Sequence, residues 1–582
     1  MRQTGGGTTG APAGIAAGRQ GAKTLVLEYL HELGGVGTAG AISTYYWGNR
    51  VGFCQEVEGG KAAWNIEQRI QWWRSKLLEA GADIWYGVLG SGAVIENVNG
   101  TAAVKGVLIT TTSGPRIVLA KTVIDATGNG CIAAAAGAEM KYINANEIAT
   151  QGHGLPPRNL GSSYTNTDYM YVDETDIEDV SQLFIYGKEK FPAAFDFGKL
   201  PDTRERPQIV GDFSFTVLDQ VNKRTYDDTI CQSKSNFDTH GYTVTPYMEI
   251  EHLHHDGHFC DMPYRSSLPQ GLDKILVGGL ATSCHRDAIP IIRMQPDLQN
   301  QGYALGCIAA KAAKENVPLR KLDIKPVQKH LVEIGNLPER VLTDKDNYED
   351  SKAALPDAIK TLPDGFKGSA QLLWHPEEAK PLLQKAYQNA SPENKIVYAM
   401  VLAGMNDPTG ADAVLDKVKN FDAWDKGWNF RGMGQFSWAS SELDRYIMML
   451  GRTHDKRGVP VICKLLNDLK PEDDFSHHRA CALALEWIGD KSAAKTVAEH
   501  LRKPGMSGYW QHDLTAAREQ DKADPKGGTA EKSRRDSLAE IGFARALYHL
   551  GDYEGVGKKI LENYSTDLRG YFSRHANEVL RR

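Results

Sequence analysis

Two side chains near the middle of the chain could handle a proton and an oxygen atom of a substrate. His285 lies in the segment Ser-Cys-His-Arg-Asp at residues 283–287. Imidazole titrates at about pH 6.5, which suits a general base. Arg293 follows, and its guanidinium could hold a substrate oxygen or a cofactor. The alternatives are a polar loop residue for His285 and a structural ion pair for Arg293.

A second group of histidines lies in residues 251–261, which read Glu-His-Leu-His-His-Asp-Gly-His-Phe-Cys-Asp. Imidazole and thiolate at such close spacing can bind zinc or iron. Strand alternation, however, would place His255 on the opposite face from His252 and His254. We therefore expect no metal here, but a polar strand and turn with one histidine at the substrate cleft. His240, two residues after an aspartate, is a similar candidate.

The start of the chain carries a glycine pattern that could hold a phosphate group. Gly5, Gly7 and Gly10 open a predicted helix at 11–20, and the strand that follows ends on Glu28. This is the pattern of a dinucleotide-binding βαβ unit. The glycines permit the turn, the approach of the pyrophosphate and close helix packing, while the acid accepts the ribose hydroxyls. The alternative, a glycine-rich surface loop, leaves the ordered strand unexplained.

The first strand of this unit is unusual, because only residues 1–4 precede the first glycine and they are mostly polar (Met-Arg-Gln-Thr). A central parallel strand is normally a nearly continuous apolar run. We expect either a chain truncated at its start or a weakened strand, and we favour truncation.

Further motifs point to one cofactor. They are Gly34-Gly35 with Gly37, Thr38 and Gly40; Val-Ile-Asp-Ala-Thr-Gly-Asn-Gly at 123–130; residues 264–269 with 275–279; and residues 293–302. Over residues 5–335 the chain resembles the FAD-dependent oxidoreductase family of flavoproteins, in the branch often found beside polysaccharide-degrading enzymes. The resemblance implies FAD as the cofactor. The expected contacts are Gly5, Gly7, Thr8, Gly10, Glu28, Gly34, Gly35, Thr38, Val88, Thr127, Gly128, Gly278, Gly279, Asn300, Gln301 and Gly302.

The resemblance also implies roles for a helix and an arginine. A helix starting near Asn300-Gln301-Gly302 would direct its N–H groups and dipole at the flavin; the alternative is a helix that is merely packed through small residues. Residues 203–212 are similar to an arginine motif of the family. Because Pro207 and Gln208 depart from that motif, only Arg204 is carried over as a catalytic residue. Asn129, where relatives often have an acid, is a further departure.

Composition excludes several classes of protein. The chain has 582 residues, 41% hydrophobic and 24% charged, with a formal net charge of −6. No basic excess suggests nucleic acid as a partner, and no run of about 18 apolar residues suggests a membrane span. The eight cysteines form no CxxC pair, which argues against a zinc ribbon or a disulfide framework. We expect a cytoplasmic protein; a periplasmic one would need a signal that the chain has lost.

The pattern along the chain predicts four parts. An α/β Rossmann-like FAD-binding domain is split between residues 1–150 and 262–335, and an α+β substrate domain is inserted at 151–261. After a linker at 336–368, residues 369–582 predict an all-α, HEAT-like array. Its helical pairs centre on Gly404, Gly451, Gly489 and Gly551. The intervals between successive centres are near the HEAT period of about 40 to 47 residues, except for the longer interval between Gly489 and Gly551. The alternative is an irregular helical bundle.

The expected function is therefore an FAD-dependent oxidoreductase. A small polar substrate, a carbohydrate or a hydroxy acid, would lose a hydride to flavin N5 while His285 or a neighbour takes the hydroxyl proton. Two alternatives stay open. One is a carbohydrate lyase that keeps the flavin for structure, and the other is an interaction protein whose helical array binds a protein partner.

Overall fold

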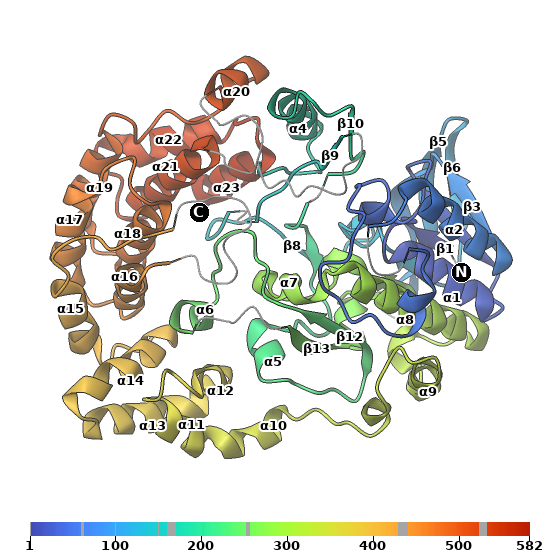
Figure 1. Ribbon diagram of the computed structural model, residues 1–582, viewed down its shortest axis with the longest axis horizontal. Helices are drawn as coiled ribbons and strands as arrows, with labels where there is room; N and C mark the ends of the chain where they lie inside the picture. The colour runs from blue at the N-terminus through green and yellow to red at the C-terminus, as the bar shows by residue number, and fades with distance from the viewer. Residues whose placement is uncertain are drawn as a thin grey trace.

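The computed structural model describes most of the chain. The described residues are 2–59, 63–98, 101–148, 151–159, 170–201, 203–251, 257–428, 440–522 and 532–582. Figure 1 shows the N-terminal α/β part on the right, the inserted segment in the centre, and the C-terminal helices curving around the left side.

A five-stranded parallel sheet forms the centre of the N-terminal domain, in the order β15-β7-β1-β2-β3. The strands are β1 (Arg2–Thr4), β2 (Thr24–Glu28), β3 (Ala82–Tyr86), β7 (Val123–Asp125) and β15 (Ile275–Val277). Strands β2, β7 and β15 are buried throughout, as expected for parallel strands covered on both faces. Their residues are apolar except for Thr24 and the terminal acids Glu28 and Asp125. The predicted βαβ unit is thus confirmed.

The short first strand β1 lies in the middle of this sheet in spite of its polar residues. It pairs with β2 and β7 in parallel, with Gln3 in register with Val26 and Ile124. The Gln3 side chain is buried and donates a hydrogen bond to the Gly5 carbonyl at 2.8 Å. A hydrogen-bonded amide therefore replaces the apolar side chain that the position usually carries.

Two helices pack together along the sheet and bring the glycine turn to it. They are α1 (Gly10–Arg19) and the long α8 (Gln295–Glu315). Gly302 and Gly306 of α8 lie directly on α1: a Cβ added to Gly302 would be 2.0 Å from the Thr9 carbonyl oxygen, and one on Gly306 would be 2.2 Å from that of Ala13. These glycines allow close packing of the two helices. A third helix, α2 (Ile66–Glu79), packs against α1.

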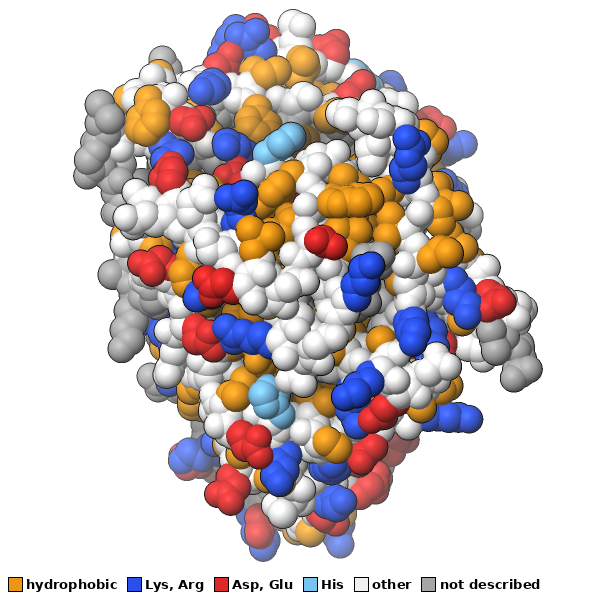
Figure 2. All heavy atoms as spheres, turned by 90° about the vertical axis from the view of Figure 1, so that its right-hand side faces the viewer, with side chains coloured by type: hydrophobic (Ala, Val, Ile, Leu, Met, Phe, Trp, Pro, Cys, Tyr) orange, Lys and Arg blue, Asp and Glu red, His pale blue; other side chains and the backbone are white. Residues whose placement is uncertain are grey.

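An antiparallel sheet covers the other side of the domain. It consists of β4 (Leu89–Val98), β5 (Thr101–Thr111) and β6 (Gly114–Leu119), with β14 (Leu272–Asp273) on the β5 edge. Alternation buries Ile109 and Val118 and exposes Leu108, Ile117 and Leu119. Figure 2, a view from the side of this domain, shows apolar side chains gathered in one area of a mixed surface.

The inserted segment contains short strands and helices. The strand pairs are β8 (Met140–Lys141) with β11 (Gln208–Ile209), β9 (Pro157–Arg158) with β10 (Asp196–Phe197), and β12 (Thr229–Ser235) with β13 (His258–Pro263). Its helices are α4 (Ile177–Lys190), α5 (Val217–Val221) and α6 (Pro246–Ile250), while α3 (Cys131–Ala135) precedes the segment and α7 (Ile289–Ile292) follows it. Two of the pairs reach past the predicted limits of 151–261, because β8 precedes the segment and β13 runs beyond it.

The expected linker at 336–368 carries structure of its own. It contains α10 (Tyr348–Ser351) and α11 (Leu355–Thr361), after α9 (Lys325–Glu333). Arg340 binds Asp261 of the inserted segment at 2.9 Å, and Arg224 binds Asp346 at 2.8 Å. These ion pairs attach residues 336–368 to the inserted segment.

The C-terminal region is helical in every part that the structure describes as regular. Its helices are α12 (Ser369–Trp374), α13 (Pro376–Asn389), α14 (Pro392–Gly404), α15 (Ala411–Lys419), α16 (Glu442–Arg452), α17 (Gly458–Asp468), α18 (Phe475–Ile488), α19 (Ala494–Leu501), α20 (Leu514–Asp521), α21 (Lys532–His549), α22 (Val556–Tyr564) and α23 (Gly570–Arg581). The predicted helical pairs around the four glycines are present. Among the described residues, no helix combines the length and the apolar character that crossing a bilayer requires.

The last helix is fastened to the inserted segment. The Tyr571 hydroxyl donates to the Glu205 carbonyl at 2.5 Å, the Gly570 amide donates to Asp179 at 2.9 Å, and Arg574 binds Asp173 at 3.0 Å. The inserted segment and the helical region also share one hydrophobic core. The C-terminal region is therefore part of the same packed body as the loop that carries Arg204.

Candidate functional site

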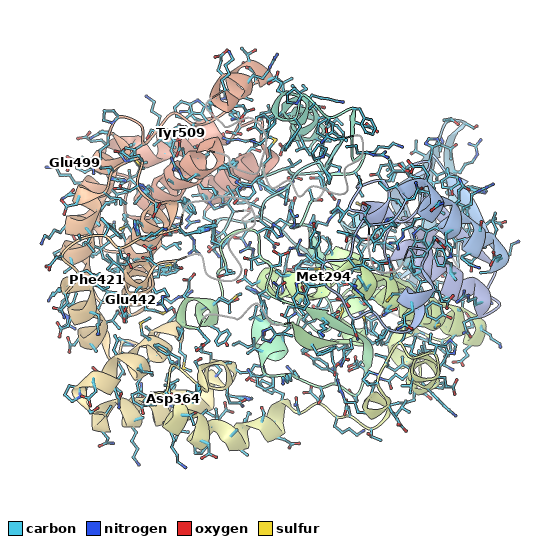
Figure 3. All side chains as sticks on the ribbon, in the orientation of Figure 1. Met294, Asp364, Phe421, Glu442, Glu499 and Tyr509 are labelled. Atoms are coloured by element: carbon cyan, nitrogen blue, oxygen red, sulfur yellow. The ribbon has the colours of Figure 1, made fainter. Side chains whose placement is uncertain are left out.

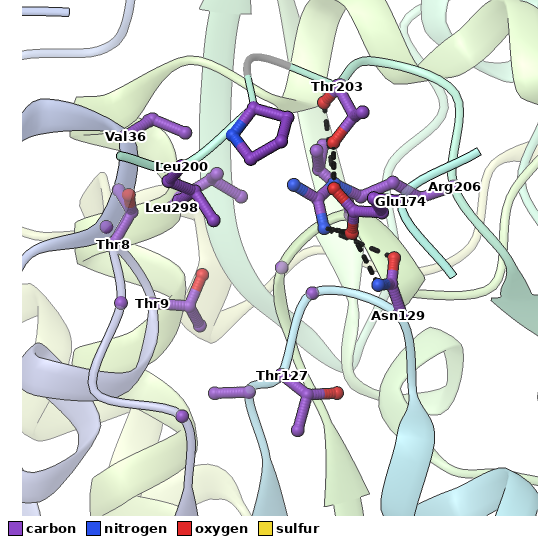
Figure 4. Close-up of a pocket in the computed structure, with 18 of the residues that line it drawn as sticks. Thr8, Thr9, Val36, Thr127, Asn129, Glu174, Leu200, Thr203, Arg206 and Leu298 are labelled. Carbon is purple, nitrogen blue, oxygen red and sulfur yellow. Dashed lines mark hydrogen bonds and ion pairs between the residues drawn. The ribbon is translucent and has the colours of Figure 1, made fainter. Parts of the chain in front are cut away.

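A cavity of about 670 Å³ lies between the N-terminal domain and the inserted segment. The glycine turn, the end of β2 and the loop after β7 line one end, which we call the glycine end (Gly5, Gly7, Thr8, Glu28, Gly128). Side chains of the inserted segment and of the residue that follows α7 line the other, which we call the arginine end (Arg204, Asp238, His240, Arg293). Figure 4 shows part of the lining.

The three glycines of the turn differ in what surrounds them. A Cβ on Gly5 would be 2.3 Å from the Ala126 carbonyl oxygen, and one on Gly10 would be 1.8 Å from that of Gly5. Gly5 and Gly10 are therefore required by the protein itself. At Gly7 the nearest atom to such a Cβ is the Gly35 Cα at 3.7 Å, so the protein leaves room there. Gly5 and Gly7 line the cavity and Gly10 lies behind it, at the start of α1.

This arrangement fits the pyrophosphate of a dinucleotide. Gly7 and Thr8 line the cavity where α1 begins, and the free N–H groups of a helix N-terminus bind phosphate. A side chain at Gly7 would fill the space that the phosphates need. The described part of the chain leaves this space at Gly7 open.

Glu28 lies at the end of β2, where the dinucleotide pattern places the ribose. Its side chain is buried and accepts the Gly6 amide at 2.5 Å and the Leu30 amide at 2.8 Å. Burial raises the pKa of the Glu28 carboxyl to about 7, although the backbone amides oppose this. The carboxyl lines the cavity and can accept hydrogen bonds from ribose hydroxyls.

The second glycine cluster packs against the first. The Gly34 amide donates to the Gly6 carbonyl at 2.9 Å, and Thr8 Oγ1 donates to the Gly34 carbonyl at 3.2 Å. Gly35 lines the cavity, whereas Gly34 and Thr38 lie behind it, with Thr38 Oγ1 on the Leu33 carbonyl at 2.6 Å. Other predicted contacts in the lining are Val88, Thr127 and Gly279.

The helix expected to start near Asn300 begins five residues earlier. α8 starts at Gln295, so the prediction of a helix start at Asn300-Gln301-Gly302 is wrong, and their N–H groups are inside the helix. Pro296 at the second helical position suits an N-terminus, and this signal in the sequence was missed. Met294, labelled near the middle of the molecule in Figure 3, precedes the helix and lines the cavity with Gln295.

Asn300, Gln301 and Gly278 support the cavity from outside its lining. Gln301 Oε1 accepts the Gly279 amide at 2.9 Å, which fixes the loop after β15. Asn300 binds the Cys54 amide and the Val51 carbonyl. A Cβ on Gly278 would be 2.6 Å from Leu305 Cδ1. The sequence motif therefore marks residues that hold the loops in place as well as residues that line the cavity.

His285 is placed away from the cavity lining that Arg204 and Arg293 share. Its Nδ1 accepts the Asp287 amide at 3.2 Å, and the side chain caps the short helix at 286–288. Asp287 in turn accepts the amides of Val244 and Thr245. The geometry gives His285 a part in the local loop structure and does not bring it to the arginine end.

A histidine–aspartate pair lies in the arginine end. His240 Nε2 is 2.8 Å from Asp238 Oδ1, and both side chains are largely buried. His240 has a φ of +51°, a conformation that is rare for residues other than glycine and recurs at functional sites. Burial raises the pKa of the Asp238 carboxyl, but His240, Arg293 and Arg204 outweigh this and hold it below its usual range. Asp238 is thus an ionised partner for the imidazole.

The two arginines reach this pair from different segments. Arg293 Nη2 donates to the Asp238 carbonyl at 2.5 Å and lies 3.6 Å from Asp238 Oδ2. Arg204 Nη1 donates to the Gly152 carbonyl at 2.5 Å, and the Gly152 amide donates to the His240 carbonyl at 2.9 Å. The sequence indicated Arg204, His240 and Arg293 separately, but it gave no sign that they meet, because the four residues come from three distant segments.

A second buried ion pair lines the cavity beside Gly128. Arg206 binds Glu174, which also accepts hydrogen bonds from Thr203 and Asn129. Figure 4 shows these four side chains joined on one side of the cavity, opposite Thr8, Val36 and Leu298. The sequence offered no signal for Glu174. The pair links the inserted segment to the loop after β7, where relatives often have an acid in place of Asn129.

The histidine cluster at 251–261 is described in part, since residues 252–256 lie outside the described residues. In the part of the chain that the structure describes, no three His, Cys, Asp or Glu side chains gather closely enough to hold a metal ion.

Comparison with known proteins agrees with the cradle for a dinucleotide. The FAD dependent oxidoreductase family matches residues 4–183 and 143–331. Solved structures similar to this chain include THI4 of Thermovibrio ammonificans (24% identity; 26% of this chain and 67% of that chain covered; TM-score 0.22). A second is a geranylgeranyl bacteriochlorophyll reductase-like protein of Thermoplasma acidophilum (16% identity; 66% of this chain and 97% of that chain covered; TM-score 0.29). A third is the OxyS anhydrotetracycline hydroxylase of Streptomyces rimosus (14% identity; 69% of this chain and 76% of that chain covered; TM-score 0.30). No curated protein sequence matches the chain.

The two matched segments together run from residue 4 to residue 331, which is more than half of the 582 residues. They contain the glycine turn, Glu28 and all four residues of the arginine end. The chain therefore belongs to the FAD-dependent oxidoreductase family, and it is an enzyme that uses FAD as its cofactor.

Proposed function

We propose that this enzyme oxidises a hydroxyl group of a small polar substrate, a carbohydrate or a hydroxy acid, bound at the arginine end of the cavity. The observation that carries the proposal is that one cavity joins the glycine end, which fits the dinucleotide, to a buried histidine–aspartate pair. Bound FAD supplies a two-electron acceptor that takes hydride at flavin N5.

His240 rather than His285 is the proton acceptor in this proposal, because only His240 lines the cavity. Asp238 accepts the Nε2–H of His240, which fixes the ring and stabilises the cation that forms on protonation. The imidazole of His240, which lines the cavity, is then the group that takes the hydroxyl proton. Arg204 and Arg293 flank the pair and can orient a substrate oxygen.

The chain holds the cofactor through its own groups in four places. Gly7 and the start of α1 hold the pyrophosphate, and Glu28 holds the ribose. The third place is the loop at Gly279, which Gln301 fixes and which lines the same cavity as Met294 and Gln295. The fourth place is the N-terminus of α8, because Met294 precedes this helix, Gln295 begins it, and both line the cavity. The helix dipole favours negative charge there.

The test is an anaerobic titration of the purified holoenzyme with sugars and hydroxy acids. A substrate of the proposed kind bleaches the flavin absorbance near about 450 nm in the absence of oxygen. A compound that is converted without any bleaching would instead support the lyase alternative. Failure of every hydroxyl compound to bleach the flavin would contradict the proposal.

We also propose that the C-terminal helices stack in a HEAT-like manner. Four pairs of consecutive helices, α14–α15, α16–α17, α18–α19 and α21–α22, support this, since α16 packs on α18 and α18 on α21. An experimental structure in which successive pairs are not related by a common rotation and translation would overturn this arrangement.

A further inference from the structure

One side of α4 forms an apolar part of the cavity that the proposed reaction does not use. Ile177, Val180 and Phe184 line the cavity at helical positions i, i+3 and i+7, and we call these three residues the α4 wall. We infer that the substrate carries an apolar group next to the hydroxyl that is oxidised, and that this group packs on the α4 wall. The inference rests on the proposed function, because it narrows the carbohydrate or hydroxy acid to one with an apolar substituent.

Two sides of α4 carry apolar residues, and they are buried to different degrees. Leu183 and Tyr186 belong to a hydrophobic core of the inserted segment. Val180 and Phe184 lie at the edge of that core and are partly buried, while Ile177 keeps 77% of its surface exposed. A row of apolar side chains that water reaches inside a cavity gains free energy when an apolar ligand group covers it.

The α4 wall begins beside the loop that carries Arg204. Glu174, three residues before Ile177, binds Arg206 and accepts a hydrogen bond from Thr203, as Figure 4 shows. Thr203 directly precedes Arg204, and Arg206 follows it by two positions. The wall is therefore attached to the arginine end, where the proposed function places the oxidised hydroxyl group. A substituent next to that hydroxyl can extend along α4 within the same cavity.

Hydrogen bonds from outside the cavity hold α4 in place. Asp179 accepts the Asp173 amide at 2.8 Å and the Gly570 amide at 2.9 Å, and Gln182 donates to Gln511 at 3.1 Å. Neither Asp179 nor Gln182 lines the cavity. The wall is thus formed before a substrate binds, so that binding has little ordering cost to overcome.

The charges of the cavity leave the apolar wall as the feature that selects among hydroxyl compounds. The described lining contains as many acidic as basic side chains, so its net charge favours neither an anion nor a cation. Burial of apolar surface, in contrast, contributes free energy in proportion to the area covered. A substrate with an apolar substituent therefore gains affinity that a wholly polar one does not.

The test compares compounds that share a hydroxyl group and differ in a phenyl or a methyl substituent. The pairs are mandelate with lactate, and phenyl β-glucoside with methyl β-glucoside. The purified holoenzyme is mixed anaerobically with each compound below saturation, and the bleaching of the flavin is timed. Binding without turnover is measured by calorimetry on holoenzyme whose flavin has been reduced beforehand. The FAD affinity of each variant is measured by titration of its apoprotein.

We expect the phenyl member of at least one pair to bind about 10- to 100-fold more tightly than its methyl partner and to bleach the flavin faster by a similar factor. Ile177→Ser and Phe184→Ser should each reduce this preference by about 5- to 10-fold. Phe184→Leu, which keeps an apolar side chain, should reduce it less. Ile185→Ser is the matched control, because Ile185 is exposed on the same helix and does not line the cavity. Every variant should keep its FAD.

The outcomes separate the inference from the proposed function. Equal affinities and rates within both pairs would overturn the inference, while the oxidation of a hydroxyl group stands. A phenyl preference that Ile177→Ser and Phe184→Ser leave unchanged would overturn the assignment to the α4 wall, and a loss of FAD affinity in the same variants would assign the wall to the flavin instead.

If no hydroxyl compound bleaches the flavin, the proposed function fails. A phenyl preference in calorimetry that depends on Ile177 and Phe184 would then support the apolar site alone, and its absence would overturn that site as well.

Discussion

The two ends of the cavity are built by different means. The glycine end consists mainly of backbone and small side chains, from two short turns that pack on each other at Gly6 and Gly34. The arginine end consists of charged side chains that come from distant segments and are held by ion pairs and carbonyl contacts. The glycine end is suited to one constant ligand, while the arginine end can change its specificity through single side chains without disturbing the nucleotide cradle.

The largest expected effect separates the two ends most clearly. His240→Gln removes the proton acceptor and keeps a polar side chain, so flavin bleaching by substrate should slow by about 10²- to 10⁴-fold. The variant should keep its FAD, because His240 does not belong to the glycine end. Stopped-flow absorbance and the FAD content of the purified protein are the measurements. His285→Gln is the matched control, and equal slowing by both variants would contradict the assignment.

Two alanine substitutions test the glycine end. Gly7→Ala places its Cβ where the nearest protein atom is 3.7 Å away, so the apoprotein should keep its stability and lose affinity for FAD. Gly10→Ala places its Cβ 1.8 Å from the Gly5 carbonyl oxygen, and should lower the free energy of unfolding by about 3 kcal/mol or more. Urea unfolding of both apoproteins, with FAD titration of the folded one, distinguishes them. Tight FAD binding by Gly7→Ala would argue against the cradle.

The ionisation of Glu28 gives a smaller effect that depends on pH. Because the pKa of this carboxyl is raised in the folded protein to about 7, the folded apoprotein binds the proton more tightly than the unfolded chain does. Its contribution to the free energy of unfolding is present below about pH 4.5 and is lost as the pH rises toward 7. Ribose hydroxyls donating to the carboxylate should lower its pKa and flatten this slope.

The measurement is urea unfolding of apoprotein and holoprotein between pH 4.5 and 8. The loss should amount to about 3 kcal/mol in the apoprotein. Glu28→Gln removes the titrating group and serves as the control. If the variant shows the same slope as the unchanged protein, another group is responsible.

The smallest expected effect concerns the support of the arginine end. Tyr571→Phe removes the hydrogen bond to the Glu205 carbonyl, next to Arg204, and should lower the free energy of unfolding by about 1 kcal/mol. We expect a higher KM for substrate and unchanged FAD content, because Tyr571 binds the backbone beside Arg204 and does not itself line the cavity. Tyr553→Phe, far from the inserted segment on the short helix before α22, is the matched control. Loss of FAD from Tyr571→Phe would show that the two ends are not independent.

Much of the glycine end could be predicted from the sequence, since its residues lie close together in a pattern that local backbone geometry requires. Glu28 and Gly7 follow directly from that pattern, whereas Thr127 follows from the resemblance to the family. The start of α8 was misplaced, because Asn300 and Gly302 serve helix packing and loop support rather than a helix start. The arginine end could not be assembled, since tertiary folding alone brings residues 204, 238–240 and 293 together.

The hydrogen bond from Tyr571 to Glu205 joins residues 366 positions apart in the chain. During synthesis the ribosome makes the glycine turn and the Arg204 loop long before the helix that anchors this loop. A nascent chain could thus acquire its nucleotide cradle while the region that selects the substrate is still incomplete. Proteolytic removal of α23 would take away this anchor together with the buried Tyr571 and Phe572, which belong to the core that the helices share with the inserted segment.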